Sequence, residues 1–502
     1  MSTQILEFLR DVSAGQGASP GPGQAAGPAR IVPPDETLPD GGLSVVDPAQ
    51  GLPVARVRRD DPADLGAVIG RAAAAQRPWA DLTAYERGDV LLGTATRIRA
   101  SLDDLSAVMT AESGKPLRES RAEWLNAAAV FEWCAEEGKR LYGRIVPARV
   151  PGRRIWILRQ PIGVVAAITA WNFPAALAAR KWAAALAAGC TVIGRPSERT
   201  PLSALAMAGL AHQAGVPLDA LQVVVTPGQP SAEAFIDDPR VRLLSFTGSE
   251  ETGSWLIERA ARSHTEIRLE LGGSAPVIVL DDADPQAAAE LSLAAKFRNA
   301  GQVCIAPARF LVADAVADDY VDALATRFDA LSVGAGTDEA TDVGPVIDES
   351  ALERLSGMVR DSVADGARLL RGGQRMDRPG TFFAPTLLDG VGNSDRISCQ
   401  EIFGPIVPVT RVRSTHEALA AANDTRFGLA AFVHTRDLDR AFWFAERLEA
   451  GIVGINETVP STAEAPFGGW KDSGNAAEGG IEALLEYTRT KYVAIAVRQP
   501  EA

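Results

Sequence analysis

The hydrophobic and polar positions of this chain change their period along its length. Over residues 62–139 apolar residues recur at helical spacing, as in DLGAVIGRAAAAQ, so this region is predicted to be helical. At 163–170 the run GVVAAITA is short, β-branched and bounded by Gly and Trp-Asn, which is typical of a buried parallel strand. Such runs then alternate with helical segments as far as residue 273. The alternation predicts a doubly wound parallel α/β sheet.

The elements of this alternating region can be placed on the chain. The expected order is a helix at 175–188, a strand at 190–195, a helix at 201–214, a strand at 221–225, a helical turn near 230–236, a strand at 241–248, a helix at 254–262 and a strand at 266–273. A second series from 275 to about 455 predicts a second α/β domain. Strand-like segments at 153–161 and 487–497 lie outside both series. The GxGxxG fingerprint is absent, so the pattern alone leaves the ligand of the first sheet open.

Length and composition restrict the class of protein. A chain of 502 residues is too long for one core, so two or more domains are expected. Hydrophobic residues make up 46% and charged residues 23%, which is the balance of a soluble globular protein. The formal charge of -14 argues against a nucleic-acid partner, because there is no basic surplus to neutralise phosphates.

The chain carries no pattern that directs it to a membrane or out of the cell. It has no run of eighteen apolar residues and no charged N-terminal region before an apolar core, so neither a membrane span nor a secretory signal is expected. The four cysteines form no CxxC pair, which favours reduced thiols and a cytoplasmic location. None of the four histidines has metal-ligand spacing, so no metal is expected. Residues 13–30 are mostly small or polar and predict a flexible tail.

Cys304 is the candidate nucleophile. It is the only cysteine flanked by Gly, Gln and Asn, within KFRNAGQVC. A thiolate attacks a carbonyl carbon well, and water can discharge the resulting thioester. The alternative is a buried small side chain, and we keep that interpretation for Cys134, Cys190 and Cys399.

Glu270 and Asn172 could assist such a nucleophile. Glu270 ends the strand-like EIRLE and precedes two glycines, where a carboxylate with a raised pKa could deprotonate the thiol or a water. Surface charge is the alternative. Asn172 follows a predicted strand end, where its amide and the backbone N–H of Cys304 could donate to a developing oxyanion. A turn asparagine before Phe-Pro is the alternative.

Four motifs occur in one order along the chain, namely WNFP at 171–174, ELGG at 270–273, KFRNAGQVC at 296–304 and EIFGP at 401–405. With them the chain resembles the NAD(P)-dependent aldehyde dehydrogenase family from about residue 31 to its C-terminus. The resemblance implies two doubly wound α/β domains plus a small β oligomerisation arm, in a homodimer or homotetramer. The boundaries it implies are a flexible tail at 1–30, a dinucleotide-binding domain at 31–148 and 161–271, a catalytic domain at 272–476, and the arm at 149–160 and 482–498.

The resemblance also implies a cofactor site. RPSERTP at 195–201 follows a predicted strand, where open α/β sheets bind nucleotides. The family usually has KPSE here, and its lysine and glutamate meet the adenosine ribose, which implies Arg195 and Glu198 with Ser197 between them. Glu198 would accept from a free 2′-hydroxyl and repel a phosphate, so NAD is expected. Arginine in place of lysine keeps NADP as the alternative.

Further polar residues are assigned through the same resemblance. The remaining cofactor contacts are Trp171, Gly248, Ser249, Glu401 and Phe403. Gly248 and Ser249 stand at a predicted helix start, which suits a pyrophosphate. Glu401 resembles the family's glutamate on the nicotinamide ribose. Lys181 and Glu478 match positions that the family uses around its proton-relay path.

Two arginines indicate the substrate class. Arg180 and Arg298 match arginines of succinate-semialdehyde dehydrogenases that grip the far carboxylate, and Ser461 with Thr462 resembles a third contact. Two guanidinium groups near Cys304 would fix both the charge and the length of an ω-carboxylated aldehyde. Surface ion pairing is the alternative for each arginine.

The sequence therefore predicts an oxidoreductase that converts succinate semialdehyde, or a related ω-carboxylated semialdehyde, to the acid. Three alternatives stay open: a general aldehyde dehydrogenase, a nucleotide-binding structural protein of the same fold, and a CoA-acylating enzyme. Glu270 favours water over CoA as the acyl acceptor.

Overall fold

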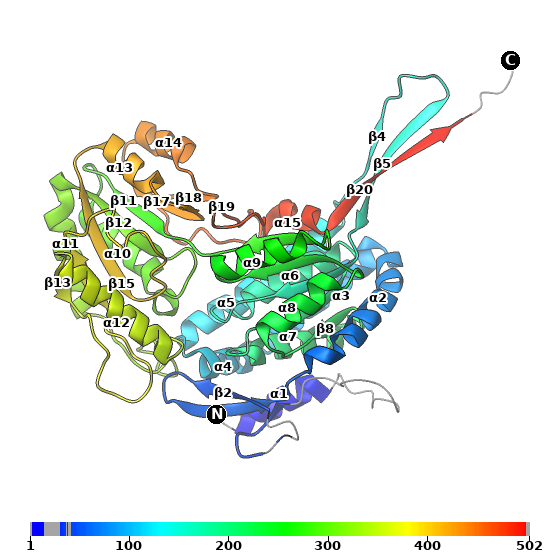
Figure 1. Ribbon diagram of the computed structural model, residues 1–502, viewed down its shortest axis with the longest axis horizontal. Coiled ribbons are helices and arrows are strands. Elements are labelled where there is room, and N and C mark those ends of the chain that lie inside the picture. The colour runs from blue at the N-terminus through cyan, green and yellow to red at the C-terminus, as the bar shows by residue number, and fades with distance from the viewer. Residues whose placement is uncertain (1–2, 15–30, 37, 39–41, 498–502) are drawn as a thin grey trace.

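A computed structural model describes residues 3–14, 31–36, 38 and 42–497. Two large sheets, each flanked by helices, make up the body, and a narrow sheet projects from it (Figure 1). The predicted α/β class is confirmed. Among the described residues, no helix combines the length and apolar character needed to cross a membrane.

The first large sheet is parallel throughout, in the order β10-β9-β6-β7-β8. Its strands are β6 (Val164–Ile168), β7 (Thr191–Arg195), β8 (Leu221–Val223), β9 (Val241–Thr247) and β10 (Glu266–Glu270), and the helices between them are α6 (Ala176–Ala187), α7 (Pro201–Ala214), α8 (Gly228–Asp237) and α9 (Glu250–Ala260). The chain proceeds from β6 to β8 on one side and then returns to β9 and β10 on the other. The carboxyl ends at such a reversal form the crevice in which open α/β sheets bind ligands.

The predicted helical region is confirmed. It contains η1 (Pro62–Asp64), α2 (Leu65–Asp81), α3 (Ala84–Ala100), α4 (Leu102–Ser113) and α5 (Leu117–Gly138). A small sheet of β1 (Ile31–Val32), β2 (Leu43–Asp47) and β3 (Leu52–Val57) precedes it.

The second large sheet has the order β13-β14-β15-β12-β11-β17-β18, and only the β13–β14 pair is antiparallel. Its strands are β11 (Ala275–Val279), β12 (Pro307–Ala313), β13 (Arg368–Arg371), β14 (Thr386–Asp389), β15 (Ile406–Val412), β17 (Ala430–His434) and β18 (Ile452–Ile455). The accompanying elements are α10 (Pro285–Lys296), η2 (Arg298–Gly301), α11 (Asp314–Asp329), α12 (Glu349–Ala364), α13 (Thr415–Asn423), α14 (Leu438–Arg447) and the paired short strands β16 (Phe427–Gly428) and β19 (Trp470–Lys471).

The projecting sheet corrects the predicted boundaries of the arm. It consists of β4 (Arg144–Val146), β5 (Arg153–Pro161) and β20 (Thr488–Ala496), all antiparallel. β4 falls inside the segment 31–148 that was assigned to the first domain, yet it pairs with β5. The arm was also predicted to begin at 482, but helix α15 (Gly480–Glu486) fills that place and packs on α6.

The prediction of a flexible tail at 1–30 is wrong for residues 3–14, which form helix α1 (Thr3–Ala14). Leu9 and Val12 lie on one face of this helix and are buried. α1 packs closely on α7, because a Cβ on Gly209 would lie only 2.6 Å from the backbone oxygen of Val12. The predicted tail at 15–30 lies outside the described residues.

Candidate functional site

Three predicted site residues meet where the carboxyl edge of the five-stranded sheet faces the amino edge of the seven-stranded sheet. Glu270 ends β10, Asn172 follows β6, and Cys304 precedes β12. A Cβ on Gly273 would lie 2.8 Å from the carbonyl oxygen of Cys304. The turn after Glu270 therefore runs directly against the cysteine loop.

The loop before Cys304 has an unusual backbone. Asn299, Ala300 and Gly301 are all left-handed, with φ values of 46°, 53° and 77°. A Cβ on Gly301 would lie 2.3 Å from the backbone oxygen of Gly404, so only glycine fits there. Two consecutive non-glycine residues in this region cost conformational free energy, which indicates that surrounding contacts impose the turn.

Asn172 is tied to this loop by hydrogen bonds on both sides. Its side-chain amide donates to the backbone oxygen of Gln302 at 3.1 Å, and its own backbone oxygen accepts from the side chain of Asn299 at 3.0 Å. Glu119 in turn accepts from the backbone N–H of Asn299 at 2.7 Å. The amide of Asn172 thus lies beside the backbone that leads into Cys304, as an oxyanion donor requires.

The carboxylate of Glu270 is fully buried, and neither oxygen has a hydrogen-bond partner among the described residues. Burial raises the pKa of Glu270 well above 4.5, and the negative charge of Glu478 raises it further. Burial, followed by the charge of Glu270, also raises the pKa of the Cys304 thiol well above 9.0. Cys304 is therefore a neutral thiol at neutral pH and needs a base to become a nucleophile.

A buried ion pair between Lys181 and Glu478 lies near Glu270. The Lys181 ammonium donates to Glu478 and, at 3.0 Å, to the hydroxyl of Ser245. The positive charges of Lys181 and Arg180 oppose the rise in the pKa of Glu270. The structure thus brings the two predicted relay residues next to the predicted base.

A cavity of about 210 Å³ opens onto Cys304 and contains Arg180, Arg298 and Ser461. Arg180 donates to the Ser461 hydroxyl at 2.9 Å. Arg298 is half-buried over the ring of Phe173, and no protein group in the described part of the chain accepts a hydrogen bond from its guanidinium. Among the described residues Arg298 therefore forms no close ion pair, although its charge acts on the carboxyl of Glu119.

Thr462, which was predicted beside Ser461 as a third substrate contact, does not line this cavity. Its hydroxyl donates to the carboxylate of Glu464 instead. The exposed carboxylate of Glu464, two residues later in the chain, therefore accepts from the Thr462 hydroxyl. Of the two predicted residues, only Ser461 lines the cavity.

The carboxyl edge of the five-stranded sheet has the features of a ligand site. The hydroxyls of Thr169, Thr226 and Thr247, at the ends of β6, β8 and β9, are buried without a partner among the described residues. Buried polar groups are usually satisfied, so this row indicates groups supplied by a ligand. Phe403 packs edge-on against Trp171, with ring centroids 5.5 Å apart.

The other predicted cofactor residues surround this edge. Burial raises the pKa of Glu401 to about 7. A Cβ on Gly272 would lie 2.7 Å from the Glu401 carboxylate, so this carboxylate lies directly against the turn after β10. Gly248 donates its N–H to the backbone oxygen of Glu270 at 3.1 Å. The Ser249 hydroxyl accepts from the backbone N–H of Thr252 and so caps α9, which engages this hydroxyl in the helix start.

Glu198 is held by two arginines. Arg59 donates to one oxygen at 2.6 Å and Arg195 donates to the other at 3.2 Å. Arg195 also donates twice to the backbone oxygen of Thr226, at 3.0 and 2.7 Å, so most of its guanidinium is engaged by protein. Ser197 accepts from the N–H of Arg199 at 3.3 Å and shapes the same turn.

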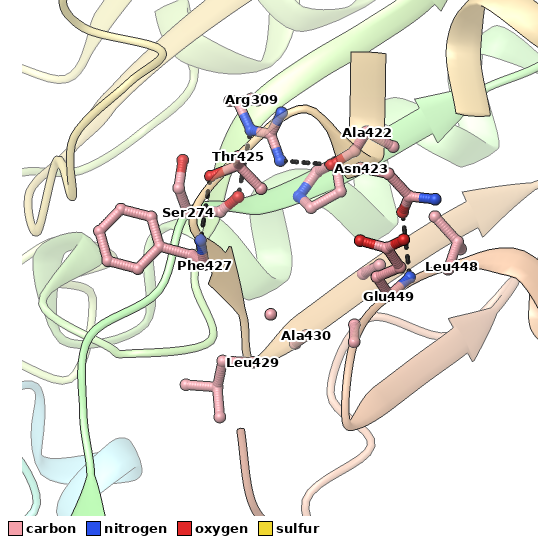
Figure 2. A pocket seen from close by; sticks show the side chains of 14 residues that line it. Ser274, Arg309, Ala422, Asn423, Thr425, Phe427, Leu429, Ala430, Leu448 and Glu449 are labelled. Atoms are coloured by element: carbon pink, nitrogen blue, oxygen red, sulfur yellow. Dashed lines mark hydrogen bonds between the residues drawn. The ribbon is translucent and has the colours of Figure 1, made fainter. Parts of the chain in front are cut away.

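Other hollows on the seven-stranded sheet contain none of the predicted site residues. The one in Figure 2 encloses only about 10 Å³. Arg309 is one of the residues that line it and donates to the backbone oxygens of Ala421 and Ala422 at 2.8 Å each. A larger hollow of about 700 Å³ lies at the carboxyl ends of β11, β12 and β15, where Arg440 pairs with Asp281. Both arginines already have protein partners.

The model of the aldehyde dehydrogenase family matches residues 37–493. The chain belongs to this family. It is 44% identical to the NADP-dependent succinate-semialdehyde dehydrogenase of Escherichia coli, over 90% of this chain and 94% of that protein. It is 42% identical to the glutarate-semialdehyde dehydrogenase of Pseudomonas putida, over 91% and 94% respectively.

A solved structure confirms the predicted fold. Betaine aldehyde dehydrogenase of Staphylococcus aureus, in a mutant complex with NAD+, superposes with a TM-score of 0.90 at 33% identity. The match covers 94% of this chain and 98% of that chain. The resemblance inferred from the four motifs is therefore confirmed at the level of family and fold.

The raised pKa of Glu270 predicts an acid limb in the pH profile of aldehyde oxidation. Below that pKa the carboxyl is protonated and cannot accept a proton, so the rate falls as the pH decreases, starting well above pH 4.5. Steady-state formation of the reduced cofactor across pH measures this. Glu270→Gln should lose the limb along with most of the rate, whereas a wild-type rate that stays flat down to about pH 5 would contradict a buried base.

Proposed function

We propose that this protein oxidises an ω-carboxylated semialdehyde, such as succinate semialdehyde, to the corresponding dicarboxylic acid with NAD or NADP. The observation that carries the proposal is the cavity of about 210 Å³ in which Arg180, Arg298 and Ser461 face the Cys304 thiol. Both relatives named above act on semialdehydes that carry a distal carboxylate. The guanidinium of Arg298, which donates to no protein group among the described residues, supplies the charge that such a carboxylate needs.

In the first step Glu270 accepts the proton of Cys304, and the thiolate sulfur attacks the aldehyde carbon. The carbonyl oxygen becomes negatively charged in the thiohemiacetal. The side-chain amide of Asn172 and the backbone N–H of Cys304 donate to that oxygen. Because Asn172 is fixed to the cysteine loop, little reorganisation is needed as the charge develops.

The row of unpartnered threonine hydroxyls, Glu401 and the Trp171–Phe403 pair fit a nicotinamide dinucleotide along the sheet edge. When bound, this cofactor accepts the hydride of the thiohemiacetal carbon. In our assignment Glu198 meets the adenosine ribose and Glu401 the nicotinamide ribose. Gly248 and Ser249 lie where the pyrophosphate would pass.

Glu270 acts again when the thioester is hydrolysed, after it has given up the proton that it took from Cys304. In our assignment that proton passes toward the Lys181–Glu478 pair, whose charges act on Glu270. The restored carboxylate then takes a proton from a water that attacks the acyl carbon, and Cys304 leaves as a thiolate. Return of this second proton from Glu270 to the thiolate restores the starting state.

The projecting sheet suits association between copies of the chain. It leaves the large side chains of Ile145, Trp156 and Tyr492 exposed at 73%, 43% and 58%. Exposed apolar groups of this size are usually covered by a partner. A homodimer or homotetramer is therefore part of the proposal, together with a cytoplasmic location for an enzyme whose four cysteines are all free.

The substrate assignment predicts a preference for charged aldehydes. Succinate semialdehyde should exceed butyraldehyde in kcat/KM by at least about 100-fold, because each charge-assisted pair contributes about 1.5–3 kcal/mol. Arg298→Ala should raise KM for the acid and leave the neutral aldehyde nearly unchanged. Equal efficiency on both aldehydes in the wild type would show that the arginines serve structure and that the enzyme is a general aldehyde dehydrogenase.

Cofactor choice depends on Glu198. NAD is expected to give the higher kcat/KM, because the carboxylate opposes a 2′-phosphate. Glu198→Ser removes that charge and frees Arg59 and Arg195 from it, so the NADP to NAD ratio of kcat/KM should rise at least about tenfold. An unchanged ratio would place the 2′-position away from this cluster, and a wild-type preference for NADP would make the arginines the dominant groups.

A further inference from the structure

A buried ion pair that the sequence motifs did not single out lies behind Asn172. Lys115 connects α4 and α5, Glu123 lies on α5, and their side chains are 0% and 1% exposed. The Lys115 ammonium donates to the Glu123 carboxylate and, at 2.9 Å, to the backbone oxygen of Asn172. It also lies over the ring of Phe173, 4.1 Å from the centroid. A buried charge costs free energy unless it has partners of this kind, so these contacts hold the ammonium in one place.

Glu123 holds the other end of the same turn. One of its oxygens accepts from the backbone N–H groups of Ala175 and Ala176, at 2.9 and 3.1 Å. Helix α6 begins there without a side-chain cap from its own N-cap residue, so Glu123 satisfies N–H groups that would otherwise be orphaned. The ion pair therefore makes hydrogen bonds to both ends of the turn 172–176.

The hydrogen bonds of this ion pair also connect it to the loop before Cys304. The backbone oxygen of Asn172 accepts from Lys115 on one side and from Asn299 on the other. Asn299 belongs to the left-handed run that leads to Cys304. A displacement of this carbonyl would move the Asn172 amide relative to the thiol, and misplacement by about 1 Å can lower a rate about 100-fold.

We propose that Lys115, held by Glu123, is a positioning residue that sets the Asn172 amide at the thiohemiacetal oxygen. This role rests on the proposed function, in which Asn172 donates to that oxygen. Lys115 contacts neither the substrate nor the reacting atoms and acts only through Asn172. Its removal should slow the chemical step while leaving cofactor affinity almost unchanged.

A double-mutant cycle tests the proposal. The rate of the pre-steady-state burst of reduced cofactor is measured with succinate semialdehyde for the wild type, Lys115→Met, Asn172→Ala and the double variant, together with the dissociation constant of the cofactor. Asn172→Ala should slow the burst about 100- to 1000-fold, as loss of an oxyanion donor does. Lys115→Met should slow it at least about tenfold, with cofactor affinity within about twofold of wild type. In the double variant the burst should be within about twofold of Asn172→Ala alone.

Two further variants make the result decisive. Lys139→Met is the matched control, because Lys139 also pairs with a glutamate, Glu136 at 2.8 Å, and lies over an aromatic ring, that of Tyr85. It should leave the burst unchanged. If Lys115→Met shows no cooperative thermal unfolding, Glu123→Gln takes its place in the cycle, because it keeps an acceptor for α6 while weakening its bond to Lys115. Glu123 also lines the cavity at Cys304, so this burst is measured at saturating succinate semialdehyde.

The outcomes separate this proposal from the proposed function. Losses that multiply in the double variant, or a Lys115→Met burst equal to wild type, would overturn positioning by Lys115 and leave Asn172 as the oxyanion donor. A normal burst in Asn172→Ala would overturn the oxyanion role itself, and the positioning role with it.

Discussion

The burial of the Glu270 carboxylate without a hydrogen-bond partner in the described structure is the constraint on which the site depends. Leaving such a group unsatisfied costs free energy, and folding tolerates it because β10 and the turn after it are held by packing on both sheets. The same burial raises the pKa of Glu270, and the charge of Glu270 in turn raises the pKa of Cys304. The Cys304 thiol therefore stays protonated until the Glu270 carboxylate accepts its proton.

Three further charged residues, Lys181, Glu478 and Arg180, act on this base and its nucleophile. Lys181 and Glu478 neutralise each other behind Glu270, where they can exchange a proton without placing a net charge in the interior. Arg180 lies on the side of the cavity and lowers the pKa of Cys304 as well as facing the pocket. In the proposed function this arginine meets the distal carboxylate of the substrate. The same side chain would then contribute to substrate recognition and to formation of the thiolate.

Sequence predicted the parts of the site that lie at strand ends. Glu270 ends β10 and Asn172 follows β6, because β-branched runs define the strands and parallel strands bring their carboxyl ends to one edge. Thr462 was misplaced because a local bond to Glu464 decides its rotamer, which no motif records. Helix α1 was missed because its packing on Gly209 is a long-range contact.

Lys115 and Glu123 escaped prediction for a different reason. Lys115, in the connection between α4 and α5, lies 57 residues before Asn172, and Glu123, within α5, lies 52 residues before Ala175. The one available signal was the position of Glu123 directly before Trp124, where the polar first turns of α5 give way to an apolar run. Such a charge indicates a buried partner but does not identify it.

In the proposed reaction Cys304 carries the acyl group and Glu270 activates the water that releases it. Intact-protein and peptide mass measurement of Glu270→Gln, mixed with succinate semialdehyde and oxidised cofactor, tests this. We expect a long-lived acyl adduct on Cys304 alone, which the wild type discharges within its turnover time. An adduct on another residue, or one that persists in Glu270→Gln/Cys304→Ala, would contradict it.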